Sequence, residues 1–326
     1  MTTFGDQVFE FGGMPVGGGG SGIIPAVNGK VYIVDYATGT DGTGAGTQIA
    51  PIRTITRFHD IVTSNLNNVA HLMGNSSPST GAQQLTDTLT WSKHLTHILG
   101  QAHNRVSQRV SIRTSGSTVF TPHVNVTAQG CVFANFHTFY GFADNSAQVA
   151  WDEDGQRNAY YNVHFGGMGA QLAADHANSR VIVIGSSGNG EHYFKNCVFG
   201  LDTVDRGAAN ATMEFVGGSP RNVFEDCVFL MRADAATPVF ITCGAGGIDR
   251  YALFRRCVFH NFTGGGGTTI TQAMSINASA GGNFLMDQCW FHGCTDVENS
   301  ASGVVFMNNC VVDTADAGLF VVNAPA

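Results

Sequence analysis

The sequence predicts an all-β fold, a parallel β-solenoid, and three observations support this prediction. A six-residue unit of the type Phe-x-x-Cys-x-Phe returns along the chain, and between Cys197 and Cys289 its copies are 30 or 32 residues apart. A second apolar segment precedes each unit. Glycine is abundant, with 42 residues, as a fold rich in turns requires. Coils that stack and bury their inward side chains on one another explain such a period.

The repeat unit itself predicts a bend. Cysteine-containing copies occupy residues 194–199, 224–229, 254–259, 286–291 and 307–312. A degenerate copy at 160–165 has Val163 at the cysteine position, and 131–133 resembles a worn first member beginning at Cys131. Apolar residues occupy the cysteine position itself, the position three residues before it and the position two residues after it. One straight strand cannot place all three on one face. The two residues before the cysteine are polar, so they predict a corner with left-handed backbone between two strands.

The inward positions should form a ladder that fills the core. The predicted ladder consists of Phe194, Cys197, Phe199, Phe224, Cys227, Phe229, Phe254, Cys257, Phe259, Cys289 and Phe291. Further strands are expected at 181–185, 213–217, 239–243 and 273–277. Stacked strands place successive sulfurs about 4.8 Å apart and pointing the same way. A disulfide needs Cβ atoms nearer about 3.8 Å and facing each other, so we expect buried thiols.

Composition argues against several classes of partner. The formal net charge is −8 and no basic cluster exists, which disfavours nucleic acid as a partner. No apolar run reaches transmembrane length, and the N-terminus lacks the basic and apolar regions of a signal peptide. We therefore expect a chain made and kept in the cytosol, with no membrane contact. No cofactor is expected, nor a metal, since Cys289 and Cys294 have only His292 beside them.

Residues 1–29 differ in composition from the rest and predict an extended N-terminal arm. Apolar residues precede a glycine-rich linker at 17–22 that cannot hold a core. A disordered tail is the alternative, but three phenylalanines within eleven residues favour an arm that folds against a protein partner. The predicted binding residues of the arm are Phe4, Val8, Phe9, Phe11, Met14 and Val16.

Residues 30–326 are expected to form one solenoid domain, with a cap at about 31–75 and coils at about 85–315. A strand at 31–35, a glycine-rich loop at 39–47 and a short helix begin it. Thr54 can cap this helix, which would plug the open end of the solenoid. Its expected apolar face consists of Ile55, Phe58, Ile61, Val62 and Leu66. The glycine-rich loop lacks the Lys and Ser/Thr of a phosphate-binding loop, so a structural role is preferred.

In these residues the chain resembles right-handed parallel β-helix proteins of the pectin-lyase-like type. The resemblance rests on Val34-Asp35, Gly39-x-Asp-Gly42, Gly46-Thr47 and Ala50-Pro51-x-x-Thr54-Ile55, and on the coil pattern downstream. It implies a right-handed winding, a strand at 69–74 and a first coil from 89–91 through 97–100. The arm, with its Phe-Gly-Asp-x-Val-Phe sequence, makes the chain similar to capsid-associated β-helix proteins of bacteriophages.

Enzymes of this fold cleave polysaccharides, so the acidic residues were considered as catalytic groups. Asp152, Glu153 and Asp154 form the best acidic cluster, but consecutive side chains diverge, and a solvated loop is the preferred interpretation. A second candidate cluster, Asp202, Asp205 and Arg206, is expected in the loop after the unit at 194–199. Charges at the corners alternate in sign and predict surface ion pairs. Lone histidines beside the repeat strands (His164, His260 and His292) are expected to be structural.

Two functions of different classes remain open from the sequence. The first is a non-enzymatic virion protein that decorates or cements the exterior of a phage capsid, assembled in the host cytoplasm. Its arm would bind the major capsid protein, and the resemblance implies a homotrimer. The second is a phage tailspike or another polysaccharide lyase or hydrolase on the same fold. Weak contacts of loops such as 142–158 and 262–272 with glycan or host surface are compatible with both.

Overall fold

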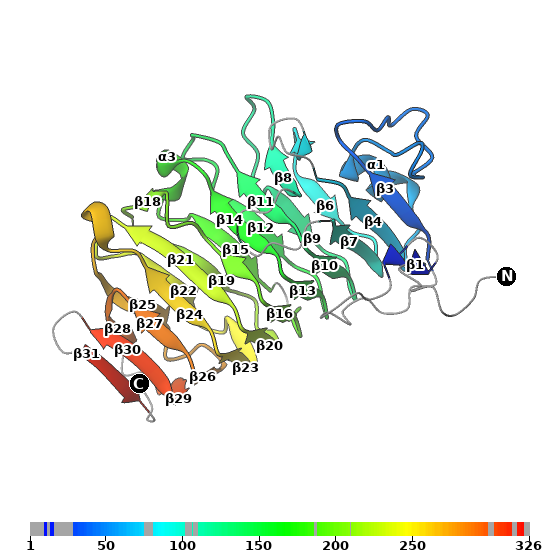
Figure 1. The fold of residues 1–326 in the computed structure, drawn as a ribbon. Coiled ribbons are helices and arrows are strands. Elements are labelled where there is room, and N and C mark those ends of the chain that lie inside the picture. The colour runs from blue at the N-terminus through cyan, green and yellow to red at the C-terminus, as the bar shows by residue number, and fades with distance from the viewer. Residues whose placement is uncertain are drawn as a thin grey trace.

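A computed structural model describes residues 29–74, 81–101, 106, 110–185, 188–208, 210–298 and 303–314, and the backbone of strands at 10–11, 14–15 and 318–322. Within these residues the chain winds as a parallel β-solenoid, as the repeat predicted. Figure 1 shows successive coils stacked side by side from the N-terminal (blue) end to the C-terminal (red) end. In the described part of the chain, no helix is long and apolar enough to cross a membrane.

Three sheets run along the stack. Sheet 1 contains β3 (Val31–Val34), β4 (Asn68–Leu72), β7 (Thr96–Gly100), β10 (Val132–Ala134), β13 (Ala159–Tyr161), β16 (Tyr193–Lys195), β20 (Ser219–Glu225), β23 (Ile248–Arg255), β26 (Gly282–Asp287) and β29 (Val305–Asn308). Sheet 2 contains β5 (Gln83–Leu85), β8 (Ser111–Thr114), β11 (His137–Tyr140), β14 (His164–Met168), β17 (Val198–Phe199), β21 (Val228–Ala233), β24 (Val258–Asn261), β27 (Trp290–His292), β30 (Cys310–Thr314) and β31 (Gly318–Val322), with β18 (Asp205–Arg206) pairing beside β21. Sheet 3 contains β6 (Leu89–Trp91), β9 (Val124–Val126), β12 (Val149–Glu153), β15 (Arg180–Ile184), β19 (Ala211–Phe215), β22 (Val239–Cys243), β25 (Ile270–Ile276) and β28 (Cys294–Glu298).

Neighbouring strands of these sheets pair in parallel, and β31 runs antiparallel to β30. A separate antiparallel pair joins β1 (Glu10–Phe11) to β2 (Met14–Pro15). Each coil therefore passes from sheet 3 to sheet 1 and then to sheet 2. The short helix α3 (Gln171–Ala174) and the 3₁₀ turn η1 (Gly264–Gly266) lie in the connections after β14 and β24.

The corner between sheets 1 and 2 has the predicted left-handed backbone. One residue of each corner has a positive φ, close to 55° in most coils. These residues are Asn135, Asn162, Asn196, Asp226, Arg256, Gln288 and Asn309. The prediction that Cys131 begins the first copy of the repeat was wrong. Phe133 pairs with Tyr160, so Phe136 and not Cys131 occupies the cysteine position. The backbone N–H of Cys131 instead donates a hydrogen bond to Asn158 Oδ1 in the next coil.

Aromatic rings stack through the core along two ladders. In sheet 1, the rings of Phe194, Phe224 and Phe254 lie 4.7 and 4.5 Å apart and nearly parallel. In sheet 2, the rings of Phe229 and Phe259 lie 4.5 Å apart, and the stack continues to Phe291. Every residue of the predicted ladder is buried. Such close, repeated contacts give the interior dense packing.

The repeat cysteines stand between these two ring ladders. Each thiol lies within hydrogen-bond distance of a main-chain carbonyl in the preceding coil, for example Cys257 Sγ at 3.5 Å from the Phe224 oxygen. All eight cysteines are free and buried. Burial raises the pKa of Cys227 and Cys257 well above the ordinary thiol value. These thiols are therefore neutral and pack as small apolar groups.

The expected helix is present as α1 (Ile55–Ile61), and Thr54 Oγ1 accepts the Arg57 N–H at 3.0 Å. Asp41 of the glycine-rich loop accepts the N–H groups of Arg53 and Thr54, which ties the loop to the helix start. The predicted apolar face was partly wrong. The helix ends before Leu66, which is 53% exposed, and Ile61 points to solvent. The plugging role of α1 and the right-handed winding stay predictions.

Candidate functional site

The outer face of sheet 3 brings polar residues from several coils into one row. Asp152 pairs with Val183, which pairs in turn with Glu214. The row continues through Thr242 and Ser275. These side chains alternate with the buried residues of their strands, so they point away from the core. The row therefore carries two carboxyl groups that are far apart in the sequence and two coils apart in the fold.

The two carboxyl groups have different surroundings. Burial, with a smaller contribution from Asp154, raises the pKa of Asp152 to about 6. Glu214 Oε2 accepts a hydrogen bond from Arg180 Nε at 2.9 Å, and both side chains are partly exposed. Because adjacent strands are about 4.8 Å apart, the backbones of Asp152 and Glu214 lie about 10 Å apart.

A groove of about 330 Å³ lies over the same face, beside Glu214. Hydroxyl and amide side chains dominate its lining. The lining residues are Arg180, Asn210, Ala211, Ala236, Thr237, Val239, Thr242, Thr271, Gln272 and Ser275. Residues after β18 and β21 form one wall, and the strands β15, β19, β22 and β25 form the floor. Such a surface offers many hydrogen-bond donors and acceptors to a polar ligand.

Asn210 stands out within this groove. Its side chain is 1% exposed, and Nδ2 donates to the Ala174 carbonyl. Its Oδ1 has no hydrogen-bond partner among the described residues, although it is buried. A buried polar atom without a partner is costly, so this oxygen is a candidate acceptor for a ligand or water.

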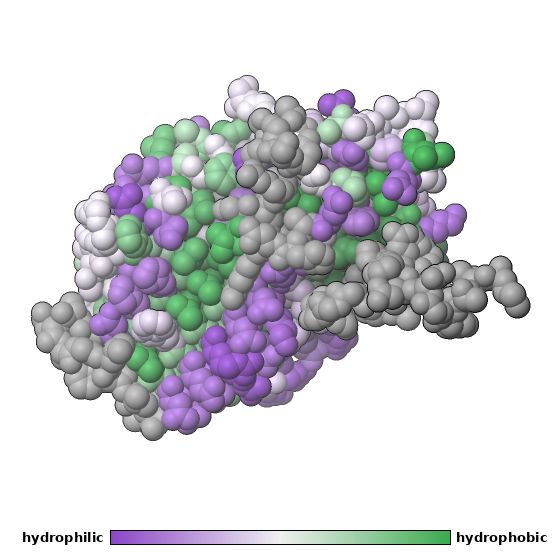
Figure 2. Space-filling model, in the orientation of Figure 1, coloured by the Kyte–Doolittle hydropathy of each residue, from purple (hydrophilic) through white to green (hydrophobic). Residues whose placement is uncertain are grey.

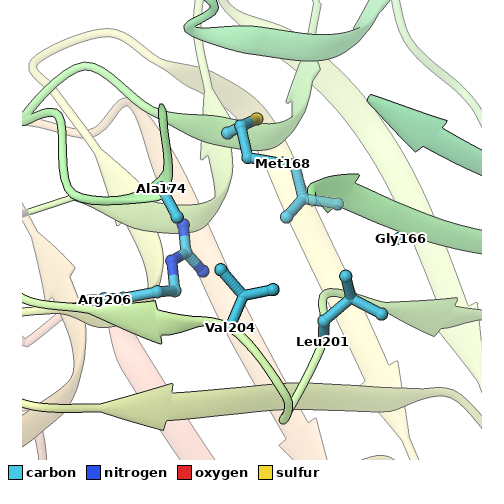
Figure 3. A pocket seen from close by; sticks show the side chains of 7 residues that line it. Gly166, Met168, Ala174, Leu201, Val204 and Arg206 are labelled. Carbon is cyan, nitrogen blue, oxygen red and sulfur yellow. The ribbon is translucent and has the colours of Figure 1, made fainter. Parts of the chain in front are cut away.

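Arg206 was predicted to lie in a loop with Asp205, but these two residues form β18 and pair with β21. Its guanidinium is buried and donates to Thr212 Oγ1 and to the Ala211 carbonyl. Burial lowers the pKa of Arg206 to about 10. Figure 3 shows this side chain pointing toward Ala174, across a small cavity from Leu201 and Met168. Arg206 thus supports the groove from behind. Its predicted neighbour Asp205 pairs with Arg232 at 3.0 Å.

The interpretation of 152–154 as a solvated loop was wrong for Glu153. Glu153 ends strand β12, points inward and is fully buried. Its carboxyl group accepts hydrogen bonds from the side chains of Trp151, Asn158 and Tyr160. Alternation along a strand explains this arrangement, because Trp151 and Glu153 face inward while Asp152 faces outward.

His192 contributes a second titratable group to this buried cluster. His192 Nε2 lies 3.8 Å from Glu153 Oε1. Burial raises the pKa of Glu153 to about 8 and lowers that of His192 to about 3. Both groups are therefore neutral near pH 7, and the pair is held by burial and hydrogen bonds rather than by an ion pair.

The histidines beside the repeat strands occur in stacked pairs. His164 is buried, lies 4.6 Å from His137 between ring centres, and contacts the Gly200 carbonyl through Nε2. His260 and His292 stack at 4.7 Å, and His292 Nε2 lies 3.0 Å from Asp313 Oδ2. No group of three or more His, Cys, Asp or Glu side chains suited to a metal ion occurs among the described residues.

The predicted surface ion pairs at the corners are present. Arg255 contacts Glu225 at 3.1 Å and Asp287 at 3.3 Å, and Arg256 contacts Asp226 at 2.7 Å. The binding residues predicted for the arm cannot be placed in the same way. Phe4, Val8, Phe9 and Val16 lie outside the described residues, and for Phe11 and Met14 only the backbone pairing of β1 with β2 is described.

Comparison with solved structures finds a likeness in fold, and comparison with families and curated proteins finds no match. Among solved structures, the chain is similar to ORF18 of Geobacillus virus E2, with 13% sequence identity and a TM-score of 0.34. The alignment covers 84% of this chain, which spans 60% of the length of ORF18.

Proposed function

We propose that this chain is a non-enzymatic structural protein of a bacteriophage particle, a right-handed parallel β-helix that decorates or cements the capsid exterior. Its N-terminal arm binds the major capsid protein, and its copies associate as a homotrimer. The virion is its place of action, after assembly in the host cytoplasm. The sequence resemblance of the arm and cap to capsid-associated β-helix proteins supports this proposal.

The continuous core ladder is the structural observation that carries the proposal. Rings stack from Phe133 through Tyr160, Phe194 and Phe224 to Phe254 without a change of register. Because each coil repeats the packing of the one before, the body is a stiff rod rather than a set of hinged parts. A stiff rod with a separate attachment segment suits a protein that stands on a particle.

Deletion of residues 2–22 tests the attachment. The truncated chain should keep the far-UV circular dichroism and thermal transition of the full chain, but should no longer cosediment with phage capsids that lack the protein. Replacement of 17–22 by a Gly-Ser sequence of equal length is the control and should bind normally. Retained binding by the truncated chain would move the attachment site onto the coils.

The second candidate function is a tailspike or another enzyme that degrades bacterial polysaccharide, and the pair Asp152 and Glu214 favours it. Inverting glycoside hydrolases use an acid and a base whose carboxyl groups are roughly 6.5 to 9.5 Å apart. The raised pKa of Asp152, about 6, suits the acid, and Glu214 beside the polar groove suits the base.

Incubation with bacterial capsular polysaccharide or O-antigen, followed by measurement of new reducing ends, tests this second function. Asp152→Asn and Glu214→Gln should each lower the rate by about 100-fold or more if these groups are the acid and base. Asp60→Asn, at an exposed carboxylate on α1, should leave the rate within about twofold. Release that is unchanged in both carboxyl variants would exclude this site.

A further inference from the structure

The outer face of sheet 1 carries an apolar stripe. In each coil the residue four places before the cysteine position points outward and is partly exposed. The stripe consists of Ala159, Tyr193, Val223, Leu253, Leu285 and Phe306, which pair in register from β13 to β29. Phe306 is 39% exposed. The row spans the strands of sheet 1 from β13 to β29, and contiguous apolar residues on an exposed sheet face mark an interaction surface.

Two polar rows flank the stripe. The corner rail stands six places before the cysteine position and consists of Arg157, Glu191, Arg221, Tyr251 and Asn283. The strand rail stands two places before it and consists of Tyr161, Lys195, Glu225, Arg255 and Asp287. Figure 2 shows hydrophilic residues gathered along the lower edge of the view, where β20, β23 and β26 of sheet 1 lie in Figure 1. An apolar centre between polar rims is the pattern of a protein interface.

We propose that sheet 1 is the contact face of a homo-oligomer in which copies stand side by side and parallel, around a symmetry axis along the stack. This inference rests on the proposed structural role, and it identifies the surface through which the copies would associate. In any such cyclic arrangement, the strand rail of one copy meets the corner rail of the next at the same height. The occupant of the stripe is thus a second copy of this chain.

Charge complementarity selects this arrangement. At equal height, Lys195 faces Glu191 of the next copy, and Glu225 faces Arg221. In the neighbouring coils Tyr161 faces Arg157, Arg255 faces Tyr251, and Asp287 faces Asn283. The aromatic–arginine pairs allow cation–π contacts, and the last pair allows a hydrogen bond. Arg250 lies beside Tyr251 at the corner of its coil and is paired with Asp249 at 3.6 Å, so the opposite charges come from the Lys195–Glu191 and Glu225–Arg221 pairs.

The same rails disfavour sliding by one coil. A shift in one direction places Glu225 against Glu191, Lys195 against Arg157, and Arg255 against Arg221. A shift in the other direction places Lys195 against Arg221. Like charges that face each other are destabilising, so the rails fix the register while the stripe supplies the buried apolar area. Intrachain pairs such as Arg157 with Glu191 at 2.6 Å hold the rail side chains in place.

Sedimentation velocity of the full chain tests the association. The expected mass is three times the 34.4 kDa of one chain, as for the proposed homotrimer. Leu253→Asp should give a monomer with unchanged far-UV circular dichroism, because it places a charge in the stripe. Thr242→Asp, on the outer face of sheet 3, is the control and should stay oligomeric. A full chain that is monomeric at about 50 μM would overturn the inference.

Engineered cysteines test the register. All eight native thiols are buried, so an exposed added cysteine is the reactive one. Coexpressed Lys195→Cys and Glu191→Cys chains should form a disulfide-linked dimer on mild oxidation, and neither variant alone should. Cross-linking of Lys195→Cys with Asp287→Cys instead would show an antiparallel pair and overturn the parallel arrangement.

The capsid assay separates the two proposals. A monomer that still binds capsids through its arm would overturn the interface alone. An oligomer that does not bind capsids would overturn the attachment alone.

Discussion

Phe224 illustrates how single inward residues hold the coils together. Its ring lies between Phe194 and Phe254 at 4.7 and 4.5 Å and is fully buried. The sequence predicted this position because the same residue types return at the same offset. It did not predict the inward-facing row two residues earlier in each coil, where Asn158, His192 and Asn222 form hydrogen bonds with neighbouring backbones. That row changes residue type from coil to coil, so no repeat marks it.

Truncation of Phe224 should therefore destabilise the protein strongly. Phe224→Ala should lower the free energy of unfolding by about 3 to 5 kcal/mol, because the removed ring leaves a cavity between two others. Chemical denaturation monitored by circular dichroism measures this. Phe262→Ala, at a phenylalanine that is 42% exposed, is the matched control and should cost less than about 1 kcal/mol. A loss below 1 kcal/mol for Phe224→Ala would contradict the stacking.

Glu153 gives a second prediction at this scale. Its pKa is raised to about 8 in the folded state, so the folded protein holds this proton more tightly than the unfolded chain. The stabilisation is present below the unfolded pKa and is lost as the pH rises through 8. The melting temperature should fall between pH 6.5 and 8.5, and less so in Glu153→Gln. Asp296→Asn, at an exposed carboxylate, should keep the wild-type slope.

At the scale of secondary-structure elements, each coil contains two corners with left-handed backbone, one between sheets 1 and 2 and one between sheets 3 and 1. Asparagine or aspartate at several corners between sheets 1 and 2 made them predictable. The corners between sheets 3 and 1 were missed. They also have positive φ, but Leu95, Arg157, Glu191, Arg221 and Arg250 occupy most of them, and these residue types carry no turn signal. The surrounding strands impose this conformation against local preference.

Gln288 tests the cost of such a corner. Its φ is 56° and its side chain is exposed, so backbone conformation dominates the effect of a substitution. Gln288→Val should lower the free energy of unfolding by about 1 to 2 kcal/mol, because a β-branched residue resists left-handed backbone. Gln288→Asn should be neutral or slightly stabilising. Equal stability of the two variants in urea titrations would argue against a left-handed residue there.

Pairing register also explains why the candidate site was only half visible in the sequence. Asp152 was noticed because it stands among other acidic residues. Glu214 stands alone between Met213 and Phe215, and only the pairing of β12, β15 and β19 places it in the row of Asp152. The outward rows of sheet 1 were hidden for the same reason, since their members lie about 30 residues apart.

Across the whole molecule, burial of neutral histidines sets the response to acid. Burial lowers the pKa of His97 to about 4 and those of His123 and His192 to about 3. The pKa values of His137 and His164 are lowered as well. A depressed folded-state pKa stabilises the protein above the unfolded value, near 6.5, and this contribution is lost as the pH falls.

The melting temperature should therefore fall steeply between pH 6.5 and 4. His123→Phe should reduce this slope, since the His123 ring is fully buried and stacks 5.2 Å from Tyr140. His94→Phe, at a partly exposed histidine, is the control. Differential scanning calorimetry across this range measures both. A slope that is the same in His123→Phe and the wild type would show that His123 is protonated in the folded state.

The shared register of consecutive coils also makes the rod's length adjustable. The segment 197–226 enters and leaves the stack at equivalent positions, and its strands meet equivalent partners on both sides. Duplicating or removing those 30 residues would join matching ends and leave every other coil in place. Gene segments of this size are therefore natural units of lengthening, and rods of graded height can be constructed from one parent.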